Sequence, residues 1–556
     1  MTPSRIPHRT TALWCALAAL LAAITLRAQA PPQASGRVRP SAHAPEGLFT
    51  HSDNCVACHN NLSTPAGEDV SIGAAWRSTI MANAARDPYF YASVRRETVD
   101  HPARSRDIQD ECAACHVPIA QKVAHMANRL ATILDDPGGP PPDTHDRVAR
   151  DGVSCTVCHQ IASEGLGTAS SFNGNFRLRA ARADGVRDLI GPFTVDKGRH
   201  TIMRSVTGFE QVEAPHIRQS ELCATCHTLI TDALGPDGRV IGSLPEQMNY
   251  QEWRHSAFDD EGRSCQSCHM PRAAGPVRVS SVLGEDRDGL SRHAFIGGNA
   301  FMLRMLNQFR QLLDVEAPGP ELEATARLTE QQLRQDTATV EIFRLQISGS
   351  VLEFDVGVRN LTGHKFPTGY PARRAWLHVR VADDGGQPLF ESGALSPQGA
   401  IAGNDNDTDP RAFEPHHDTI EQADQVQIYE SVLGDADSRP TTGLLSAVKY
   451  LKDNRLLPRG FDKATADPQI GVFGAAISDD SFGGGGDRVR YRITSTGGRR
   501  AARVDVELRY QPIGYRWAHN LEAYQSAETV RFVSFFRAME TSTSTVVATA
   551  SRTSGE

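Results

Sequence analysis

The sequence lacks an excess of positive charge. It has 58 Lys and Arg against 66 Asp and Glu, and removing residues 1–30, which hold three arginines and no acidic residue, changes the balance to 55 minus 66, or −11. An acidic chain is a poor partner for nucleic acid, so we expect no nucleic-acid binding. Beyond the N-terminus there is also no apolar run of the roughly 20 residues that cross a membrane, so we expect no transmembrane span in the mature chain.

Signatures of several enzyme classes are missing as well. The glycine run at Phe482–Asp487 (FGGGGD) lacks the Lys and the Ser or Thr of a phosphate-binding loop. No Ser/His/Asp group and no pair of carboxylates can be assigned from the sequence, so hydrolase chemistry has no support.

Cysteine is scarce, and almost all of it occurs in one pattern. Only 11 of the 556 residues are cysteine, and ten of them form five copies of CxxCH, two cysteines three positions apart followed directly by histidine. The eleventh, Cys15, lies in the N-terminal stretch. Five copies in so cysteine-poor a chain are not a chance result. The motifs are Cys55, Cys58 and His59; Cys112, Cys115 and His116; Cys155, Cys158 and His159; Cys223, Cys226 and His227; and Cys265, Cys268 and His269.

Several chemistries use closely spaced cysteines. A disulfide closed by CxxC stabilises little and leaves the invariant histidine unexplained. Zinc sites would combine the motifs in pairs, and five is odd; a redox dithiol needs one copy in a βαβ unit. CxxCH is the attachment sequence of c-type haem, in which both thiols bond to the porphyrin and the histidine binds iron from the proximal side. We therefore expect five covalently bound haem c groups with these ten cysteines and five proximal histidines.

The N-terminus has the features of an export signal. A basic start, the apolar run ALWCALAALLAAITL and a small-x-small site ending at Ala30 predict a signal peptide over residues 1–30. An uncleaved N-terminal anchor is the alternative. Residues 31–47 are rich in Pro and Gly and predict a flexible leader. We expect a periplasmic or extracellular protein.

The rest of the chain predicts an α+β multidomain fold. Residues 48–300 hold all five motifs among modest helices, at Gly73–Glu97 and Ile119–Leu134, and long irregular stretches, as in a mainly helical and irregular multihaem domain. Residues 301–337 have the period of a helical hairpin connector, with helices at Phe301–Leu313 and Glu321–Asp336.

From residue 338 the apolar period changes to two. Leu352, Phe354, Val356 and Val358 alternate, and similar runs surround residues 377–381, 489–493 and 504–510. Residues 338–556 therefore predict an antiparallel β-sandwich-like domain with a long insertion at 399–487. Within the insertion, Thr442–Asp453 is a candidate helix.

Half of the chain resembles multihaem cytochromes of the c-552/c-554 type, which are relatives of hydroxylamine oxidoreductase and pentahaem nitrite reductase. The resemblance rests on APHIRQSELCATCH (residues 214–227), PEQMNYQEWRHSAFDDEGRSCQSCHMP (245–271) and RHAFIGGN (292–299), and NLTGHKFPTGYPARRAWLHV (360–379) is similar to the β-domain of some of these cytochromes. Nitrite reductases of this group carry lysine after the cysteines of the catalytic haem, whereas all five motifs here end in histidine. Met81 stands where such cytochromes carry a distal histidine.

Several residues are candidates for the second axial ligands. The stretches that resemble the family contain His216 and His293. His364 leaves a predicted strand into a loop with Pro367 and Gly369, and could reach from the β-domain onto a haem. For each histidine the alternative is a solvated or hydrogen-bonded side chain, and for Met81 it is helix packing. The full set of candidate distal ligands is His145, His200, His216, His255, His293, His364 and Met81.

A calcium site is a further alternative. Asp405, Asp407 and Asp409 alternate, with Glu414 nearby, and such oxygen ligands suit calcium. The loop lacks the Gly and Glu of an EF-hand, so a solvated acidic loop is the other interpretation. His416 and His417 follow directly, without a pattern that assigns them as ligands.

These features predict an exported pentahaem cytochrome that transfers electrons between redox partner proteins or small redox molecules. The alternative is a haem oxidoreductase that acts on a small nitrogen or sulfur compound at one haem with an open coordination position.

Overall fold

The computed structural model describes residues 47–136, 142–494 and 501–554. The predicted signal peptide and nearly all of the predicted leader lie outside these residues. Gly47–Glu556 form one compact unit. Within the described ranges, no helix combines the length and the apolar character that a membrane span needs. The unit mixes helices with several antiparallel sheets, so the α+β class is confirmed.

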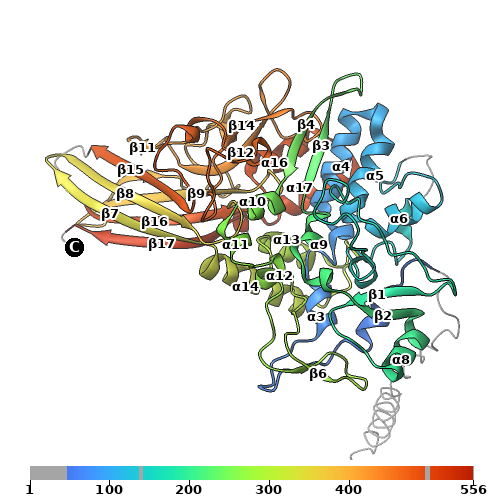
Figure 1. The fold of residues 1–556 in the computed structure, drawn as a ribbon. Coiled ribbons are helices and arrows are strands. Elements are labelled where there is room, and N and C mark those ends of the chain that lie inside the picture. Colours follow the sequence, from blue (N-terminus) through green and yellow to red (C-terminus); the bar gives the residue numbers. More distant parts are fainter. Residues whose placement is uncertain (1–46, 137–141, 495–500, 555–556) are drawn as a thin grey trace, which may run out of the picture. The chain divides into compact units, whose positions relative to one another are not determined.

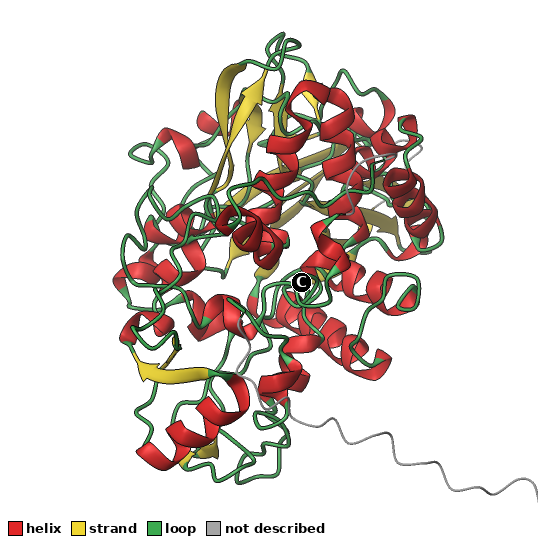
Figure 2. Ribbon diagram, turned by 90° about the vertical axis from the view of Figure 1, so that its right-hand side faces the viewer, coloured by secondary structure: helices red, strands yellow, loops and turns green. Residues whose placement is uncertain are grey.

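The region of the five motifs consists of short helices joined by long loops (Figure 2). Its elements also include a parallel strand pair, β1 (Arg187–Gly191) with β2 (Phe209–Glu213), and an antiparallel pair, β3 (Leu229–Leu234) with β4 (Val240–Gln247). The helices are α2 (Asp53–Val56), α3 (Ile72–Arg77), α4 (Pro88–Asp100), α5 (Ser105–His116), α6 (Pro118–Met126), α7 (Cys155–Cys158), α8 (Lys197–Thr207), α9 (Ser220–Ala224), α10 (Asn249–Arg254), α11 (Ala257–Asp260) and α12 (Cys265–His269).

Three of the predicted helices were too long, and one of them, Phe301–Leu313, ends at Gln308. The stretch Gly73–Glu97 is divided between α3 and α4, because Asp87 caps a new helix that begins at Pro88. The Asp87 carboxylate accepts hydrogen bonds from the N–H groups of Tyr89 (2.8 Å) and Phe90 (3.2 Å). The stretch Ile119–Leu134 is helical only to Met126, since Asn128 adopts a positive φ that ends the helix.

A pair of packed helices follows the last motif. The first, α13 (Ala300–Gln308), buries Met302 and Met305 completely, and the second, α14 (Gly319–Asp336), buries Leu322 against them. Burying a side chain of this size contributes about 1.5 to 3 kcal/mol. The two methionines therefore act as packing residues in this cluster.

Two antiparallel sheets dominate the second half of the chain. In the smaller sheet, β8 (Val351–Asn360) lies between β7 (Ala338–Ser348) and β15 (Gly486–Thr494), and β15 also pairs with the short parallel strand β11 (Thr419–Ile420). The larger sheet has the order β13 (Pro440–Thr441), β12 (Ile428–Gly434), β9 (Arg374–Asp383), β16 (Ala501–Gln511) and β17 (Thr545–Thr553), with β10 (Pro388–Ser392) on β9 and β14 (Lys449–Asp453) on β12. Figure 1 shows β7, β8, β16 and β17 as long neighbouring strands.

The period-two pattern places one apolar side chain opposite another. Val356 on β8 lies opposite Ile342 on β7 and Val489 on β15, and Val379 on β9 lies opposite Val506 on β16. All five side chains belong to one buried cluster to which both sheets contribute. This shared apolar cluster is the largest core of the described chain.

The predicted helix at Thr442–Asp453 is wrong. Residues 449–453 form β14, which pairs antiparallel with β12, so part of the predicted insertion belongs to the larger sheet. In β14, Tyr450 and Lys452 are buried, and pairing with a neighbouring strand overrides the local helical pattern.

Candidate functional site

Each CxxCH motif lies on a short helix or at the end of one. In the first, third and fourth motifs, the N–H of the histidine donates to the carbonyl of the first cysteine, for example His59 to Cys55 at 2.9 Å and His159 to Cys155 at 3.0 Å. This single helical turn brings the two sulfurs and the imidazole to one side of the chain, since residues three and four apart lie on the same helix face. None of these ten cysteines forms a disulfide with another described residue.

Three of the five proximal histidines are oriented through Nδ1. The Nδ1 atoms of His59, His159 and His269 lie 2.7, 2.6 and 2.5 Å from backbone carbonyl oxygens of Val279, Ile190 and Ile296. A carbonyl can only accept, so Nδ1 carries the proton and the lone pair of Nε2 is free. This is the tautomer and orientation that a metal-ligating histidine needs.

His116 is held differently. Its Nδ1 is buried and has no hydrogen-bond partner. The ring of Phe90 stacks on the imidazole with centroids 3.9 Å apart and planes 5° from parallel. Packing, and not a hydrogen bond, orients this ring, so its nitrogen receives no polarisation from a carbonyl.

Burial favours the neutral form of several imidazoles in this region. It lowers the pKa of His116, His227 and His293 to about 4, and it also lowers the pKa of His159. Iron binds the neutral imidazole, so the sites are ready for a metal at neutral pH.

Two proximal imidazoles have a second imidazole opposite. His159 faces His293 with ring centroids 6.3 Å apart and planes 14° from parallel, and His269 faces His364 at 6.3 Å and 16°. Two imidazoles bonded to opposite sides of one metal ion at about 2 Å each would place their centroids about 6 Å apart. The thiols, the free Nε2 atoms and these opposed rings fit a covalently attached haem with two axial histidines. Among the described residues, no second imidazole lies at a comparable distance from His59, His116 or His227.

His216 and Met81 do not face a proximal imidazole. His216 is buried, and its Nε2 is 2.9 Å from the carbonyl oxygen of Ile161, which leaves only Nδ1 for another partner. Met81 is partly buried in the turn after α3, where its carbonyl oxygen accepts a hydrogen bond from Val153 N–H at 3.0 Å. Both remain predictions as axial ligands.

The other three candidates have polar partners of their own. The His145 side chain is 66% exposed and lies 3.8 Å from Asp135. His200 Nδ1 lies 3.5 Å from a carboxylate oxygen of Glu210. His255 Nε2 lies 3.2 Å from a backbone carbonyl oxygen. As axial ligands, these three histidines also remain predictions.

Thiols of different motifs lie near one another and shift one another's pKa. Cys155 raises the pKa of Cys55, Cys226 raises that of Cys115, and Cys265 raises that of Cys223. Burial, and to a lesser extent the nearby Cys226, raises the pKa of Cys158. These neighbouring pairs link all five motifs.

In the acidic loop considered as a calcium site, the carboxylates do not lie together around one point. Both oxygens of Asp407 accept from the guanidinium of Arg374, at 2.8 and 2.9 Å, and Asp409 pairs with Arg411 at 2.9 Å. Asp405 does not join them in any group of three or more ligand side chains among the described residues. The arginines occupy the oxygens that a calcium ion would need.

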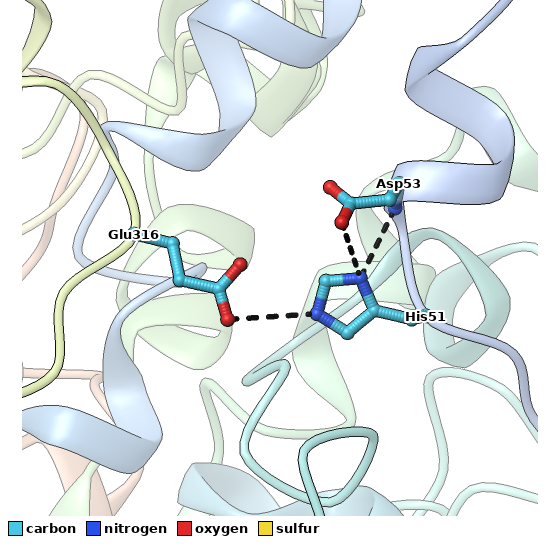
Figure 3. A group of neighbouring side chains, drawn as sticks. All are labelled: His51, Asp53 and Glu316. Atoms are coloured by element: carbon cyan, nitrogen blue, oxygen red, sulfur yellow. Dashed lines mark hydrogen bonds and ion pairs between the residues drawn. The ribbon is translucent and has the colours of Figure 1, made fainter. Parts of the chain in front are cut away.

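One group of ligand-type side chains lies just before the first motif (Figure 3). His51 Nδ1 accepts a hydrogen bond from the N–H of Asp53 at 3.2 Å, and its Nε2 lies 3.3 Å from Asp151 and 3.8 Å from Glu316. Arg147 pairs with both Asp53 and Glu316 at 2.7 Å. The group is an ion-pair network in which arginine already neutralises the carboxylates.

A second such group is buried beside the smaller sheet. His416, Asp479 and Asp487 bring their ligand atoms together. However, His416 Nδ1 accepts from the amide nitrogens of Gln427 (2.8 Å) and Asn454 (3.0 Å), whose oxygens are held by backbone N–H groups. Nε2 must then carry the proton that it donates to Asp479 at 3.0 Å. This tautomer leaves no free lone pair for a metal.

Sequence reasoning did not find the groups that orient the ligands. The acceptors for Nδ1 are backbone carbonyls, which have no signature in side-chain type. The motif sequence identified the cysteines and proximal histidines, but the partner of each imidazole depends on the fold.

The arrangement of short motif-bearing helices and antiparallel sheets is the fold of a multihaem cytochrome c. A penta-haem cytochrome c552 from Thermochromatium tepidum has a crystal structure similar to this chain, with a TM-score of 0.53 and 17% sequence identity over 91% of this chain and 99% of that one. The likeness at this identity concerns the fold. No protein-family model matches the sequence, and the comparison with curated proteins finds no match.

Proposed function

We propose that the chain is a pentahaem c-type cytochrome of the c-552/c-554 type that transfers electrons between redox partners. The observation that carries this proposal is the proximity of thiols from different motifs, which links all five attachment sites. Haem supplies one-electron chemistry once it is bound. The chain's part is to hold the groups side by side and to fix their axial ligands.

The opposed imidazole pairs support electron transfer. His159 with His293 and His269 with His364 would occupy both axial positions of their haems, so these irons would keep the same ligands in both oxidation states.

We also propose that three regions follow one another along the chain. The two large sheets form a sandwich-like domain over residues 338–556, supported by their common apolar cluster, and a pentahaem domain (48–300) and a helical connector (301–337) precede it. The N-terminal sequence supports export to the periplasm or the outside of the cell. The partners would be redox proteins or small redox molecules.

A second function is favoured by a different observation. His59, His116 and His227 have no opposing imidazole at about 6 Å among the described residues. An iron with one protein ligand could bind a small molecule. The alternative is therefore a haem oxidoreductase that acts on a small nitrogen or sulfur compound at such a site.

The spin states of the five irons would separate the two functions. Electron transfer alone predicts a protein that is low-spin throughout, binds no carbon monoxide when reduced and exchanges electrons rapidly with small redox partners. The enzyme predicts a high-spin haem that binds nitrite or hydroxylamine and converts it. Turnover of either compound would overturn the electron-carrier proposal.

A further inference from the structure

The loop that carries His364 is tied to the region of the motifs through one buried residue. His364 and Lys365 lie between β8 and β9, and Lys365 is fully buried. His364 Nδ1 lies 2.9 Å from the carbonyl oxygen of Lys365, so this nitrogen donates and the lone pair of Nε2 is free. The orientation of the His364 ring therefore depends on where Lys365 is held.

Lys365 is held at both of its ends. Its ammonium group donates to Asp453 at 2.7 Å and to the carbonyl of Gly471 at 2.8 Å. Its backbone N–H donates to a carboxylate oxygen of Glu252 at 3.2 Å. Asp453 and Gly471 belong to the β region, whereas Glu252 lies on α10, between the fourth and fifth motifs.

Glu252 makes further contacts that fix the same loop. The oxygen that accepts from Lys365 also accepts from the hydroxyl of Thr368 at 2.5 Å, and the other oxygen pairs with Arg455 at 3.0 Å. The Glu252 side chain has no exposed surface. Arg455 in turn pairs with Asp453 at 2.7 Å.

Two cations and two anions are thus buried together with balanced charge. Such a cluster is weak evidence for stability, because removing each charge from water costs several kcal/mol. The contribution of this buried charge cluster is a fixed geometry. Here the geometry is that of a loop with a candidate axial ligand, connected to a helix of the motif region.

We propose that Glu252 is a positioning residue that holds His364 on the iron of the haem attached at Cys265 and Cys268. It acts through the N–H of Lys365 and the hydroxyl of Thr368, and it does not itself contact the iron site. The inference rests on the proposed haem binding of this chain and extends it to a residue outside the motifs.

The test uses the full-length protein with its haems attached. Glu252→Gln replaces two acceptor oxygens by one and removes the charge opposite Arg455. We expect the reduced variant to bind one more carbon monoxide per chain than the unmodified protein, and the oxidised variant to gain the high-spin signal of one haem. His364→Ala should give the same change, and added imidazole should restore the low-spin signal in both. A Glu252→Gln protein that stays low-spin and binds no additional carbon monoxide would overturn the proposal.

Glu261 offers a matched control. It also forms an ion pair between the motif region and the β region, with Arg459 at 2.5 Å, but this pair lies at the surface. Glu261→Gln should leave the spectrum unchanged. If Glu261→Gln changes the spectrum as Glu252→Gln does, the loss of any ion pair between the two regions is sufficient to open the haem, and the positioning role of Glu252 is wrong.

Substitutions of Thr368 test the positioning role of Glu252 without changing a buried charge, and they apply also if Glu252→Gln does not fold. Thr368→Val removes one hydrogen bond to Glu252 and should give a smaller high-spin fraction at the same haem, whereas Thr368→Ser keeps the hydroxyl and should remain low-spin. Identical spectra for the two variants would contradict the proposal.

The outcomes also distinguish this inference from the proposed function. Fewer than five haems in the unmodified protein would refute the function. Five haems, with one opened by His364→Ala and none by Glu252→Gln or Thr368→Val, would refute the positioning role alone.

Discussion

The imidazoles of His269 and His364 face each other with centroids 6.3 Å apart, although they come from opposite halves of the chain. One belongs to the fifth motif and the other to a loop between two strands of the β region. The β region therefore contributes directly to the candidate haem site. Loss of this region should remove an axial ligand as well as a part of the fold.

Haem content is the first prediction. Each motif places two thiols and one imidazole together, so the matured protein should carry five covalently bound haems, measured by intact mass and a pyridine haemochrome assay. Replacing Cys265 and Cys268 with serine should leave four. A fully matured unmodified protein with fewer than five would contradict the assignment.

His293 should be an axial ligand, because it faces His159 as His364 faces His269. His293→Ala is expected to convert one low-spin haem to high-spin and to create one new carbon monoxide site in the reduced protein. His145→Ala is the control, since this side chain is largely exposed and lies beside Asp135. Equal spectra for the two variants would show that His293 does not bind iron.

Met81 gives a prediction about reduction potentials. If its sulfur binds iron, that haem has a higher potential than haems with two histidines, since methionine favours ferrous iron. Met81→His should then lower one potential in a redox titration and leave the others in place. Met126→His changes an exposed methionine and serves as control. A titration that Met81→His does not alter would assign Met81 to packing.

Asp487 should make stability depend on pH. Burial, followed by the charge of Asp479, raises its pKa to about 7, against about 4 in the unfolded chain. Between these values the folded state binds the extra proton, so this contribution to stability is complete below pH 4 and is lost as pH rises to 7. Asp487→Asn cannot ionise, and its free energy of unfolding relative to the unmodified protein should increase over this range by on the order of 4 kcal/mol.

Denaturant unfolding at several pH values would measure this effect. Asp437→Asn, at an exposed aspartate in a turn, is the matched control. A difference between Asp487→Asn and the unmodified protein that stays constant from pH 4 to 7 would be evidence against a protonated Asp487.

The sequence was sufficient for the parts of this molecule that depend on local patterns. Alternating residues such as Leu352 and Phe354 predicted β8, and the spacing of the motifs predicted which side chains come together within each turn. The sequence did not predict contacts between distant segments. The pairing of His159 with His293 and the cluster of four charges that includes Lys365 join segments far apart in the chain. The strand at residues 449–453 exists only because β12 lies beside it.

The proximity of thiols from different motifs also bears on how the protein is made. Neighbouring thiols such as Cys223 and Cys265 can be oxidised to a disulfide, and each such bond would consume two sulfurs needed for thioether formation. In the oxidising surroundings that we propose for this protein, a chain that folded first would be exposed to this side reaction at three places. We therefore expect the thiols to be kept reduced until haem is attached, before or while the chain closes around it.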